Sequence, residues 1–307
     1  MFTKMTDDIY KLVVQFPFGM GNVNSYLIEG TNGYTVIDTG TNQQEAIDIW
    51  EEVLKSGIKV EKVVLTHTHE DHIGLARWFQ EVVGVPVIVS KEGLEVMERR
   101  RNLSLEQFNQ LIKKYGGDEL SKGSRGEISI FDFTPDELFE ETQPIKLGDY
   151  LYETIWTPGH AEDQYCFYNQ EKGTMIVGDH VLKEVSPVIG LWSGVEFNPL
   201  KDYFSSLDKV ENYLPKISLP GHGEPIFDLQ QRVVEIREKH QYRLEQIYHM
   251  VENEPKTVTQ VCEEIYGENY QISAFMAIIT RFIYLEDIGH VERRVMEGEI
   301  NFLAIEK

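Results

Sequence analysis

Four short stretches constrain this sequence most, because each follows an apolar, β-rich run and ends in residues that bind metal ions. The first is THTHEDH at 66–72, and the others are TPGH at 157–160, VGD at 177–179 and LPGHG at 219–223. A turn after a strand lets residues that are not adjacent converge on one point, and a neighbouring glycine permits a tight turn. One Gly-His pair occurs often by chance, but the four stretches together predict one site built at several strand ends.

The first stretch is the richest in metal-binding side chains. Three of the nine histidines in the chain fall within its six positions 67–72, together with two carboxylates. His67 and His69 can share one metal ion, and Asp71 and His72 can contribute to a second ion beside it. Imidazole and carboxylate suit Zn²⁺, Mn²⁺ or Fe²⁺. A solvated loop with incidental histidines would explain an isolated His-x-His pair better than it explains five ligand-type residues in six positions.

The first part of the chain alternates β-rich runs with helical patterns, which favours a sheet covered by helices. Apolar residues recur with helical spacing at 42–57, and we expect a second helix at 74–84. The expected strands are 10–16, 24–30, 33–40, 60–66, 85–90, 150–159, 164–170, 173–179 and 216–223. Residues 91–145 are expected to be an insertion of surface helices or a cap over the site. This insertion would contain charged helices, a loop at 118–129 and a short capped helix at 134–142.

The sequence from residue 229 onward is organised differently. Its pattern predicts a long helix at 229–252, two further helices, and a hairpin at 290–306 with a Glu-Gly turn. Three helices and a hairpin suggest a winged-helix-like domain at 229–307 that follows a catalytic domain at 1–228. The apolar helix ISAFMAIITRFIYLED would allow a homodimer, or it could pack against the rest of the chain.

Charge and composition limit the partners that we expect. The net charge is 29 − 51 = −22, which repels phosphate backbones and anionic lipids at long range, so nucleic-acid binding is not expected. The N-terminus has no basic region followed by an apolar one, and no apolar run approaches the roughly 18 residues of a membrane span. We therefore expect a soluble, cytoplasmic protein. Cys166 and Cys262 lie in apolar contexts, which is typical of buried, reduced thiols.

Taken in order, the four stretches resemble the His-x-His-x-Asp-His, His, Asp, His ligand set of the metallo-β-lactamase superfamily. The resemblance covers residues 10–228, and GNVNSYLI and TVIDTG also match the opening strands of that family. The tail, with GDHVL at 178–182 and DYFSSLDKV at 202–210, resembles one hydrolase branch that has a winged-helix extension. The implied fold is α+β: a four-layered αβ/βα sandwich with the site at one edge of two facing sheets, plus a small C-terminal winged-helix-like domain.

The resemblance also implies the roles of individual residues. It places His67, His69 and His160 on a first metal ion, and Asp71, His72 and His222 on a second, with Asp179 bridging both. Asp38 would orient a ligand imidazole by a hydrogen bond, or would only cap a turn. His180 would line the site or serve packing. Tyr203 would reach the substrate pocket, or would be a core tyrosine.

The implied activity is hydrolysis. Two ions about 3.5–4 Å apart would lower the pKa of a bridging water, and the resulting hydroxide would attack a carbonyl carbon or phosphorus. Asp71 could also orient this nucleophile and carry its proton. We expect zinc ions, with manganese or iron as alternatives, and a small ester, thioester or lactone as substrate. The loop at 16–24, the insertion and the tail would set selectivity.

Other activities remain open at this point. A ribonuclease or phosphodiesterase is the main alternative, although the tail is poor in basic residues, with one local pair at Arg293 and Arg294. Oxidative chemistry at iron is a further alternative, but the iron enzymes of this kind typically replace the histidine at position 69 with a carboxylate. The complete ligand set disfavours a binding module without activity.

Overall fold

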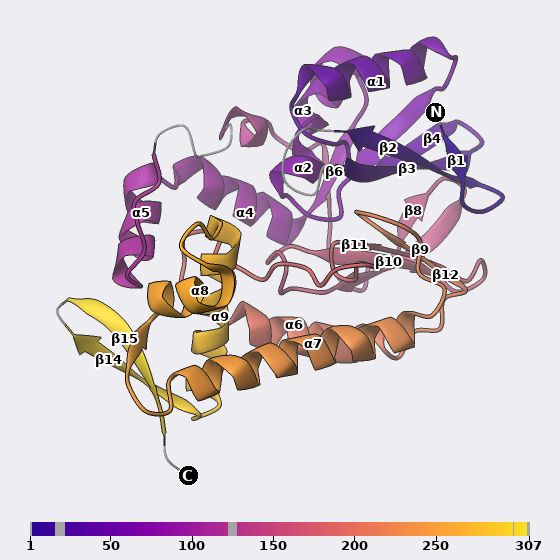
Figure 1. The fold of residues 1–307 in the computed structure, drawn as a ribbon. Helices are drawn as coiled ribbons and strands as arrows, with labels where there is room; N and C mark the ends of the chain where they lie inside the picture. The colour runs from indigo at the N-terminus through magenta and orange to yellow at the C-terminus, as the bar shows by residue number, and fades with distance from the viewer. Residues whose placement is uncertain (1, 16–21, 122–127, 297, 306–307) are drawn as a thin grey trace.

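Two β-sheets face each other, and helices cover their outer faces (Figure 1). The computed structural model describes residues 2–15, 22–121, 128–296 and 298–305. The first sheet has the order β1 (Thr3–Lys4), β2 (Ile9–Gln15), β3 (Asn22–Gly30), β4 (Gly33–Ile37), β5 (Val60–Val64), β6 (Val87–Ser90), β7 (Glu137–Phe139). Strands β1 to β4 pair antiparallel, whereas β4 to β7 pair parallel.

The second sheet is mostly antiparallel. Its order is β12 (Ile217–Pro220), β11 (Thr174–Gly178), β10 (Tyr165–Asn169), β9 (Tyr150–Trp156), β8 (Ile145–Leu147). Only β11 and β12 pair in parallel. Helices α6 (Pro199–Val210) and α7 (Leu229–Met250) run along its outer face (Figure 1).

Helices α1 (Gln44–Lys55) and α3 (Ala76–Trp78), with a π-helical turn at Phe79–Val83, cover the first sheet. In α1, Ala46, Trp50 and Val53 follow helical spacing, so they share one face and are buried. The Trp50 indole also donates a hydrogen bond to the Thr39 carbonyl at 2.7 Å, which joins the helix to the loop after β4.

Three clusters of buried apolar residues separate the layers. One lies between α1, α3 and the first sheet, a second lies between the two sheets, and a third lies between the second sheet, α6, α7 and the C-terminal elements. Three apolar interfaces between successive layers make a four-layered sandwich. The predicted four-layered sandwich is therefore confirmed, while the winged-helix-like character of the C-terminal part stays a prediction.

Residues 91–145 contain helices, as predicted, but also return to the first sheet. Helix α4 (Lys91–Asn102) and α5 (Leu105–Lys114) are followed by a 3₁₀ turn at Ile128–Phe131. The short helix expected at 134–142 is wrong, because this segment contains β7. Asp136 accepts a hydrogen bond from the Val87 amide at 2.8 Å, and its own amide donates to the Val87 carbonyl. This pairing with β6 prevails over the local helix signals.

The C-terminal part contains the predicted helices and hairpin. After α7 come β13 (Lys256–Thr257), α8 (Val258–Tyr266), α9 (Ile272–Asp287), β14 (Val291–Met296) and β15 (Glu299–Ala304), with the sheet order β13-β15-β14. Residue 297 of the expected Glu-Gly turn, residues 16–21 of the expected selectivity loop at 16–24, and residues 122–127 of the expected loop at 118–129 fall outside the described residues. The apolar residues of α9 are buried in the third cluster, within this chain. The apolar pattern of α9 is therefore explained by packing against the rest of this chain, the second of the two alternatives that the sequence left open.

The insertion and the C-terminal part touch directly. Tyr115, at the end of α5, stacks with Phe302 of β15 at a centroid distance of 6.4 Å, and the Thr259 hydroxyl donates to the Gly116 carbonyl. Cys166 and Cys262 are both buried free thiols, as predicted. Among the helices that the structure describes, none has the length and apolar character needed to span a membrane.

Candidate metal centre

All seven predicted ligands lie at the ends of four strands and meet in one place. Residues 67–72 follow β5 of the first sheet and include the short helix α2 (Glu70–Ile73). His160 follows β9, Asp179 follows β11 and His222 follows β12, all in the second sheet. The cluster therefore lies where the ends of strands from the two sheets come together, at one side of the sandwich, as the sequence suggested.

The ligand atoms fall into groups that could each hold a metal ion. One group is His67, His69 and His160, a second is Asp71, His72 and His222, and a third is His67, His72 and Asp179; within each, the ligand atoms lie within 4.8 Å of one another. The first two groups match the two sets implied by the sequence resemblance.

Asp179 lies between these two groups. Its Oδ2 is 3.5 Å from Nε2 of His160 and 3.2 Å from Nε2 of His222, and its Oδ1 is 3.5 Å from Nε2 of His72. A single carboxylate therefore reaches histidines of both groups, which is the position that a bridging ligand requires.

Asp38 fixes the orientation of two imidazoles at once. Its Oδ2 is 2.9 Å from Nδ1 of His72 and accepts the Thr66 hydroxyl proton at 2.7 Å, while its Oδ1 accepts the Thr66 amide at 2.8 Å. Because the only hydroxyl proton of Thr66 points to Asp38, its oxygen can accept the Nδ1 proton of His67, 3.0 Å away. Asp38 therefore acts on His72 directly and on His67 through Thr66.

Backbone oxygens orient two further histidines. Nδ1 of His160 lies 2.9 Å from the Val188 carbonyl, and Nδ1 of His222 faces the Asn22 carbonyl. A carbonyl can only accept, so each Nδ1 carries a proton, and in the neutral ring Nε2 presents a lone pair to a metal ion.

The atoms that remain without partners are those a metal ion would need. Nε2 of His67, His72 and His222, and Oδ1 of Asp179, are buried and have no hydrogen bond among the described residues. Nδ1 of His69 also lies only 2.9 Å from the lone-pair Nε2 of His160, so a proton or a cation must lie between them. Buried polar atoms normally find a partner, and a divalent cation would satisfy all of these. The donor set therefore fits metal ions.

The charges of the cluster lead to the same conclusion. Burial lowers the pKa of His67, His69 and His160, so these rings are neutral and available as ligands. Burial alone would lower the pKa of His222, but Asp179 outweighs it and raises the pKa to about 10. In the metal-free protein, protons on imidazole thus supply positive charge beside the buried carboxylates, a role that bound cations would take over.

The loop that carries His222 is held by the first sheet. The Tyr26 hydroxyl donates to the Pro220 carbonyl at 2.6 Å, and the Asn24 amide side chain donates to the carbonyls of Pro220 and Gly223 at 2.9 Å each. Glycine is required at position 221, because a Cβ there would overlap Asp179 and lie 2.7 Å from Cε1 of His72. The glycines beside the ligands thus allow the close approach that the sequence suggested.

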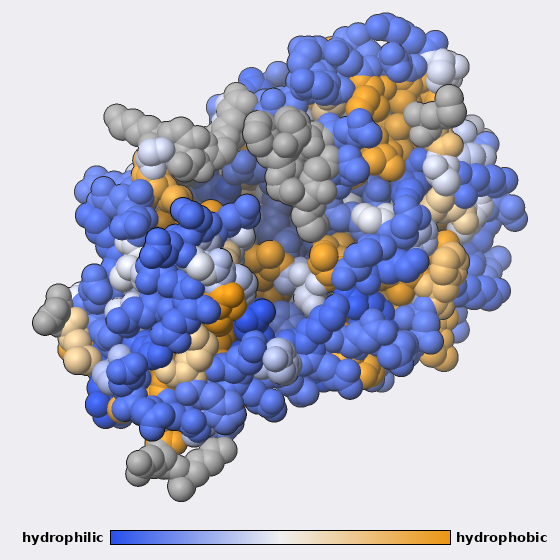
Figure 2. All heavy atoms as spheres, viewed as in Figure 1, coloured by the Kyte–Doolittle hydropathy of each residue, from blue (hydrophilic) through white to orange (hydrophobic). Residues whose placement is uncertain are grey.

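A cavity of about 480 Å³ adjoins the cluster. Its wall includes the ligands His69, Asp71, His160, Asp179 and His222, the apolar residues Leu182, Pro187, Val188 and Trp192, and Ser273 of α9. None of the described residues that line it is lysine or arginine. Figure 2 shows this face of the molecule hollowed near its centre, with apolar atoms at the edge of the hollow.

Comparison with known proteins agrees with this geometry. The family model described as the metallo-beta-lactamase superfamily matches residues 18–222, which is most of the chain. The chain belongs to the metallo-β-lactamase superfamily. Membership of this superfamily and the cluster of ligands make it a metal-dependent hydrolase.

Several superfamily relatives are similar over much of their length. The probable metallo-hydrolase YqjP of Bacillus subtilis (strain 168) is 29% identical and covers 96% of this chain and 93% of its own. The atrochrysone carboxyl ACP thioesterase of Aspergillus fumigatus is 26% identical over 76% of this chain and 63% of its own. The crystal structure of a metallo-beta-lactamase family protein from Thermus thermophilus has a TM-score of 0.86 and 27% identity, covering 98% of this chain and 99% of its own.

Two of the residues expected near the site, Tyr203 and His180, lie in the core. Tyr203 is fully buried, and its hydroxyl donates to the His180 carbonyl at 2.8 Å. His180 is also fully buried, with its ring 5.3 Å from that of Tyr203. The substrate contact expected of Tyr203 is therefore corrected to a core position, since helix α6 places its side chain beneath the loop after β11.

Sequence reasoning missed several residues that support the ligands of the superfamily site. The Thr66 hydroxyl donates to Asp38 and lies within hydrogen-bonding distance of His67, so it connects the two. Asn24 and Tyr26 hold the His222 loop by hydrogen bonds. Arg100 of α4 pairs with Glu70 at 2.7 Å. Their roles depend on contacts between distant segments, so no local pattern marked them.

Proposed function

We propose that this chain is a dinuclear hydrolase that acts on a carbonyl substrate, namely an ester, a thioester or a lactone. The observation that carries the proposal is the pair of ligand groups joined by Asp179, with buried nitrogen and oxygen atoms that lack partners. His67, His69 and His160 would hold one ion, Asp71, His72 and His222 the other, and Asp179 would contact both.

We further propose that both ions are zinc. Imidazole supplies five of the seven ligand side chains, and zinc binds imidazole nitrogen and carboxylate oxygen with little geometric demand. Manganese and iron accept the same donors, so metal analysis of protein from its natural host would decide between them.

The residues of this chain would share the remaining tasks. A pair of divalent ions supplies activation of a water molecule and stabilisation of negative charge on the substrate oxygen. Asp71, with Oδ2 3.3 Å from Nε2 of His222, would orient the attacking water and accept its proton. Asp38 would hold the imidazoles of His72 and His67 in place through the reaction.

The cavity favours a carbonyl substrate over a polyanion. Leu182, Val188 and Trp192 offer an apolar wall for an acyl chain, whereas phosphate groups would find no lysine or arginine among the described residues of the wall. The relative named as a thioesterase supports the same class of substrate. A phosphodiesterase or ribonuclease would need contacts to phosphate, which usually come from basic side chains.

The test is hydrolysis by zinc-loaded protein of a thioester, an acyl lactone, an aryl ester, a phosphodiester and a short RNA. Asp179→Ala serves as the metal-site control, and a chelator followed by added zinc tests reversibility. We expect turnover of at least one carbonyl substrate, its loss in the variant, and its return with zinc. Cleavage of RNA or the phosphodiester without carbonyl turnover would overturn the proposal.

A further inference from the structure

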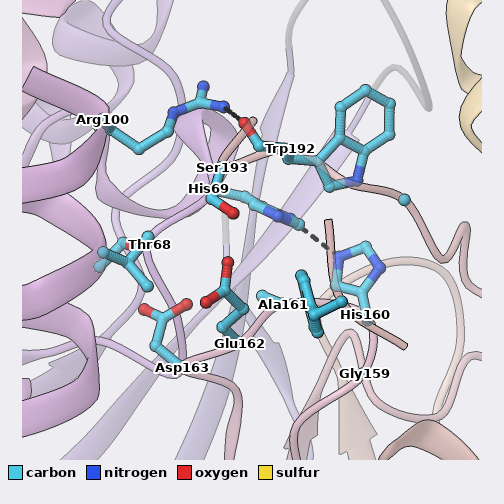
Figure 3. A pocket seen from close by; sticks show the side chains of 13 residues that line it. Thr68, His69, Arg100, Gly159, His160, Ala161, Glu162, Asp163, Trp192 and Ser193 are labelled. Carbon is cyan, nitrogen blue, oxygen red and sulfur yellow. Dashed lines mark hydrogen bonds between the residues drawn. The ribbon is translucent and has the colours of Figure 1, made fainter. Parts of the chain in front are cut away.

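A second, smaller pocket lies directly behind the ligands His69 and His160 (Figure 3). Helix α4, the loop after β9 and the segment around Trp192 and Ser193 form its walls. It shares His69, His160 and Trp192 with the larger cavity, so the two spaces adjoin across these three side chains.

Four oxygen atoms in this small pocket have no partner among the described residues. They are both carboxylate oxygens of Asp163 and the hydroxyl oxygens of Thr68 and Ser193. These residues are only 1%, 2% and 6% exposed, respectively. A buried carboxylate without partners is costly, so this group needs either a proton or a molecule that donates hydrogen bonds to it.

Asp163 faces the loop that carries the first two ligands. Burial raises the pKa of the Asp163 carboxyl to about 6. The nearby hydroxyl and backbone of Thr68, which stands between His67 and His69, act in the opposite direction on this pKa, although the Thr68 hydroxyl and the carboxyl are too far apart or too poorly aligned for a hydrogen bond. Figure 3 shows the Asp163 carboxyl group below Thr68 and beside α4, and both residues line the pocket. Asp163 also lies three residues after His160, so one loop carries both a ligand-type histidine and a carboxylate near Thr68.

Helix α4 closes this arrangement from the side. A Cβ at Gly93 would lie 3.3 Å from Oδ2 of Asp163 and 3.4 Å from Thr68, so the glycine lets both residues approach the helix. On the same helix, Arg99 pairs with Glu162 next to Asp163. Any movement of Asp163 would therefore disturb the contact between α4 and the ligand loop.

The pocket has room for one water molecule. About 20 Å³ is open to the centre of a water molecule, close to the minimum that a buried water requires, and such a water needs two to four polar partners. The two carboxylate oxygens of Asp163 and the hydroxyl of Thr68 supply that number, and the Ser193 hydroxyl lines the same pocket from another wall. If the Asp163 carboxylate accepts both protons of this water, its two oxygens gain hydrogen bonds. The water oxygen can then accept the hydroxyl proton of Thr68.

We propose that Asp163 is a positioning residue that holds the His67–His69 loop through a buried water, and so sets the affinity of the first metal ion. This inference rests on the proposed two-ion function. Asp163 touches neither the ions nor the substrate. It acts because the peptide at Thr68 determines where the imidazoles on both sides of it point.

The test compares zinc binding by wild type, Asp163→Asn and Glu98→Gln, with zinc or cobalt alone as the probe and a chelator as competitor. Glu98→Gln is the matched control, since it removes one negative charge from the exposed face of α4. We expect Asp163→Asn to weaken binding of one ion by about 10-fold or more and to change the visible spectrum of cobalt. The second ion and the control should stay within about 3-fold of wild type. Metal-free Asp163→Asn should unfold at no lower temperature than metal-free wild type.

The outcomes separate this inference from the proposed function. If wild type binds no zinc, the proposed function fails, and this inference fails with it. If wild type binds two ions and Asp163→Asn binds both equally well with an unchanged cobalt spectrum, only the inference is overturned. Equal loss of both ions with a lower unfolding temperature would mean a general structural role, which also overturns it. A crystal structure of wild type without a water between Asp163 and Thr68 would overturn the proposed means of contact.

Discussion

At the scale of single residues, Asp38 shows how one carboxylate can organise a site that it does not enter. Its backbone has φ 57°, a left-handed conformation that aspartate tolerates better than most residues. From that position its two oxygens receive three hydrogen bonds, from the amide and hydroxyl of Thr66 and from His72. Glycine would adopt this backbone more easily but would provide no acceptor.

We expect Asp38→Asn to weaken metal binding and to reduce activity. Asparagine keeps the size of the side chain but has one acceptor oxygen, so either Thr66 or His72 loses its partner. Loss of such an outer contact typically lowers metal affinity by about 10- to 100-fold. Zinc competition with a chelator measures this, and Asp48→Asn, on the exposed side of α1, is the matched control. Wild-type affinity in Asp38→Asn would contradict the orienting role.

The ligands could be predicted from sequence, whereas most of their supports could not. Histidine and carboxylate side chains are common metal ligands, and their spacing at a strand end is local, so the ligand-type residues from His67 to His72 were recognisable. Asp163 and Arg100 act on segments about 95 and 30 residues away, respectively, and their chemistry gives no local signal. Tyr203 was assigned wrongly in the opposite direction. Its place in DYFSSLDKV at 202–210 suggested a contact with substrate, but its side chain is buried in the core.

At the scale of elements, α4 connects the two loops that carry the first ligands. Arg100 donates to the Trp192 carbonyl at 2.7 Å and pairs with Glu70 at 2.7 Å. Arg99, one residue earlier, pairs with Glu162. The helix therefore does more than cover the site, because it fixes Trp192, which forms part of the cavity wall.

We expect Arg100→Lys to impair substrate binding more than metal binding. The single ammonium group of lysine cannot reproduce the forked contact to Glu70 and Trp192. The wall at Trp192 should loosen, with a rise in KM of about 5-fold or more and little change in zinc affinity. Steady-state kinetics on the best carbonyl substrate would measure this, with Arg101→Lys on the same helix as control. An unchanged KM would show that Trp192 is held by other contacts.

Strands and helices were predicted well where the local sequence pattern determines the secondary structure. They were predicted poorly where pairing with a distant strand determines it. The runs of apolar residues at β2 to β6 and β9 to β12 gave strands within a few residues of those observed. The segment at 134–142 looked helical by its residues, yet parallel pairing with β6 made it β7. The boundary between two domains at 228 stays a prediction, because α7 packs on the second sheet and in the same cluster as α9.

At the scale of the whole molecule, the C-terminal part reaches the site. Ser273, in the first turn of α9, lines the cavity that contains the ligands, although it lies 51 residues after the last of them. The cavity beside the ligands is thus formed jointly by the sandwich and the C-terminal elements. Selectivity should respond to changes in both.

We expect Ser273→Trp to reduce activity on long acyl substrates while leaving zinc binding intact. A large ring at this position would fill part of the cavity of about 480 Å³ without touching the ligands. Comparing kcat/KM for short and long acyl chains would show a selective loss of about 10-fold or more for the long ones. Glu268→Trp, at an exposed position before α9, is the control. Equal activity on both chain lengths would place the acyl group elsewhere.

One carboxylate, Glu196, forms ion pairs with both the insertion and the C-terminal part and so joins them. Glu196 contacts Lys114 of α5 at 2.6 Å and Arg293 of β14 at 2.8 Å. Burial would raise the pKa of Glu196, but Lys114, Tyr115 and Arg293 outweigh it and lower the pKa to about 2. A carboxylate with a lowered pKa adds stability above its unfolded-state pKa, and this contribution is lost as the pH falls toward 2.

We therefore expect wild type to exceed Glu196→Gln in unfolding free energy by about 1 kcal/mol at pH 7, after allowance for solvent screening. The difference should shrink as the pH falls from about 4.5 toward 2, because protonation removes the charge that the variant lacks. Denaturant unfolding of both metal-free proteins over this range measures it, with Glu238→Gln on α7 as control. A difference that does not vary with pH would contradict the assigned charge pairs.

The division of the ligands between the two sheets has a consequence for biosynthesis. The first ligand, His67, and the last, His222, are 222 − 67 = 155 residues apart, and the loop that carries His222 is held by β3 from the start of the chain. A nascent chain leaving the ribosome would display the histidine-rich loop long before the rest of the site exists. A metal captured at that stage would have at most half of its final partners. If these side chains hold the ions as proposed, we expect full coordination only after the second sheet has packed against the first, so that metal acquisition would be a late step in the maturation of this enzyme.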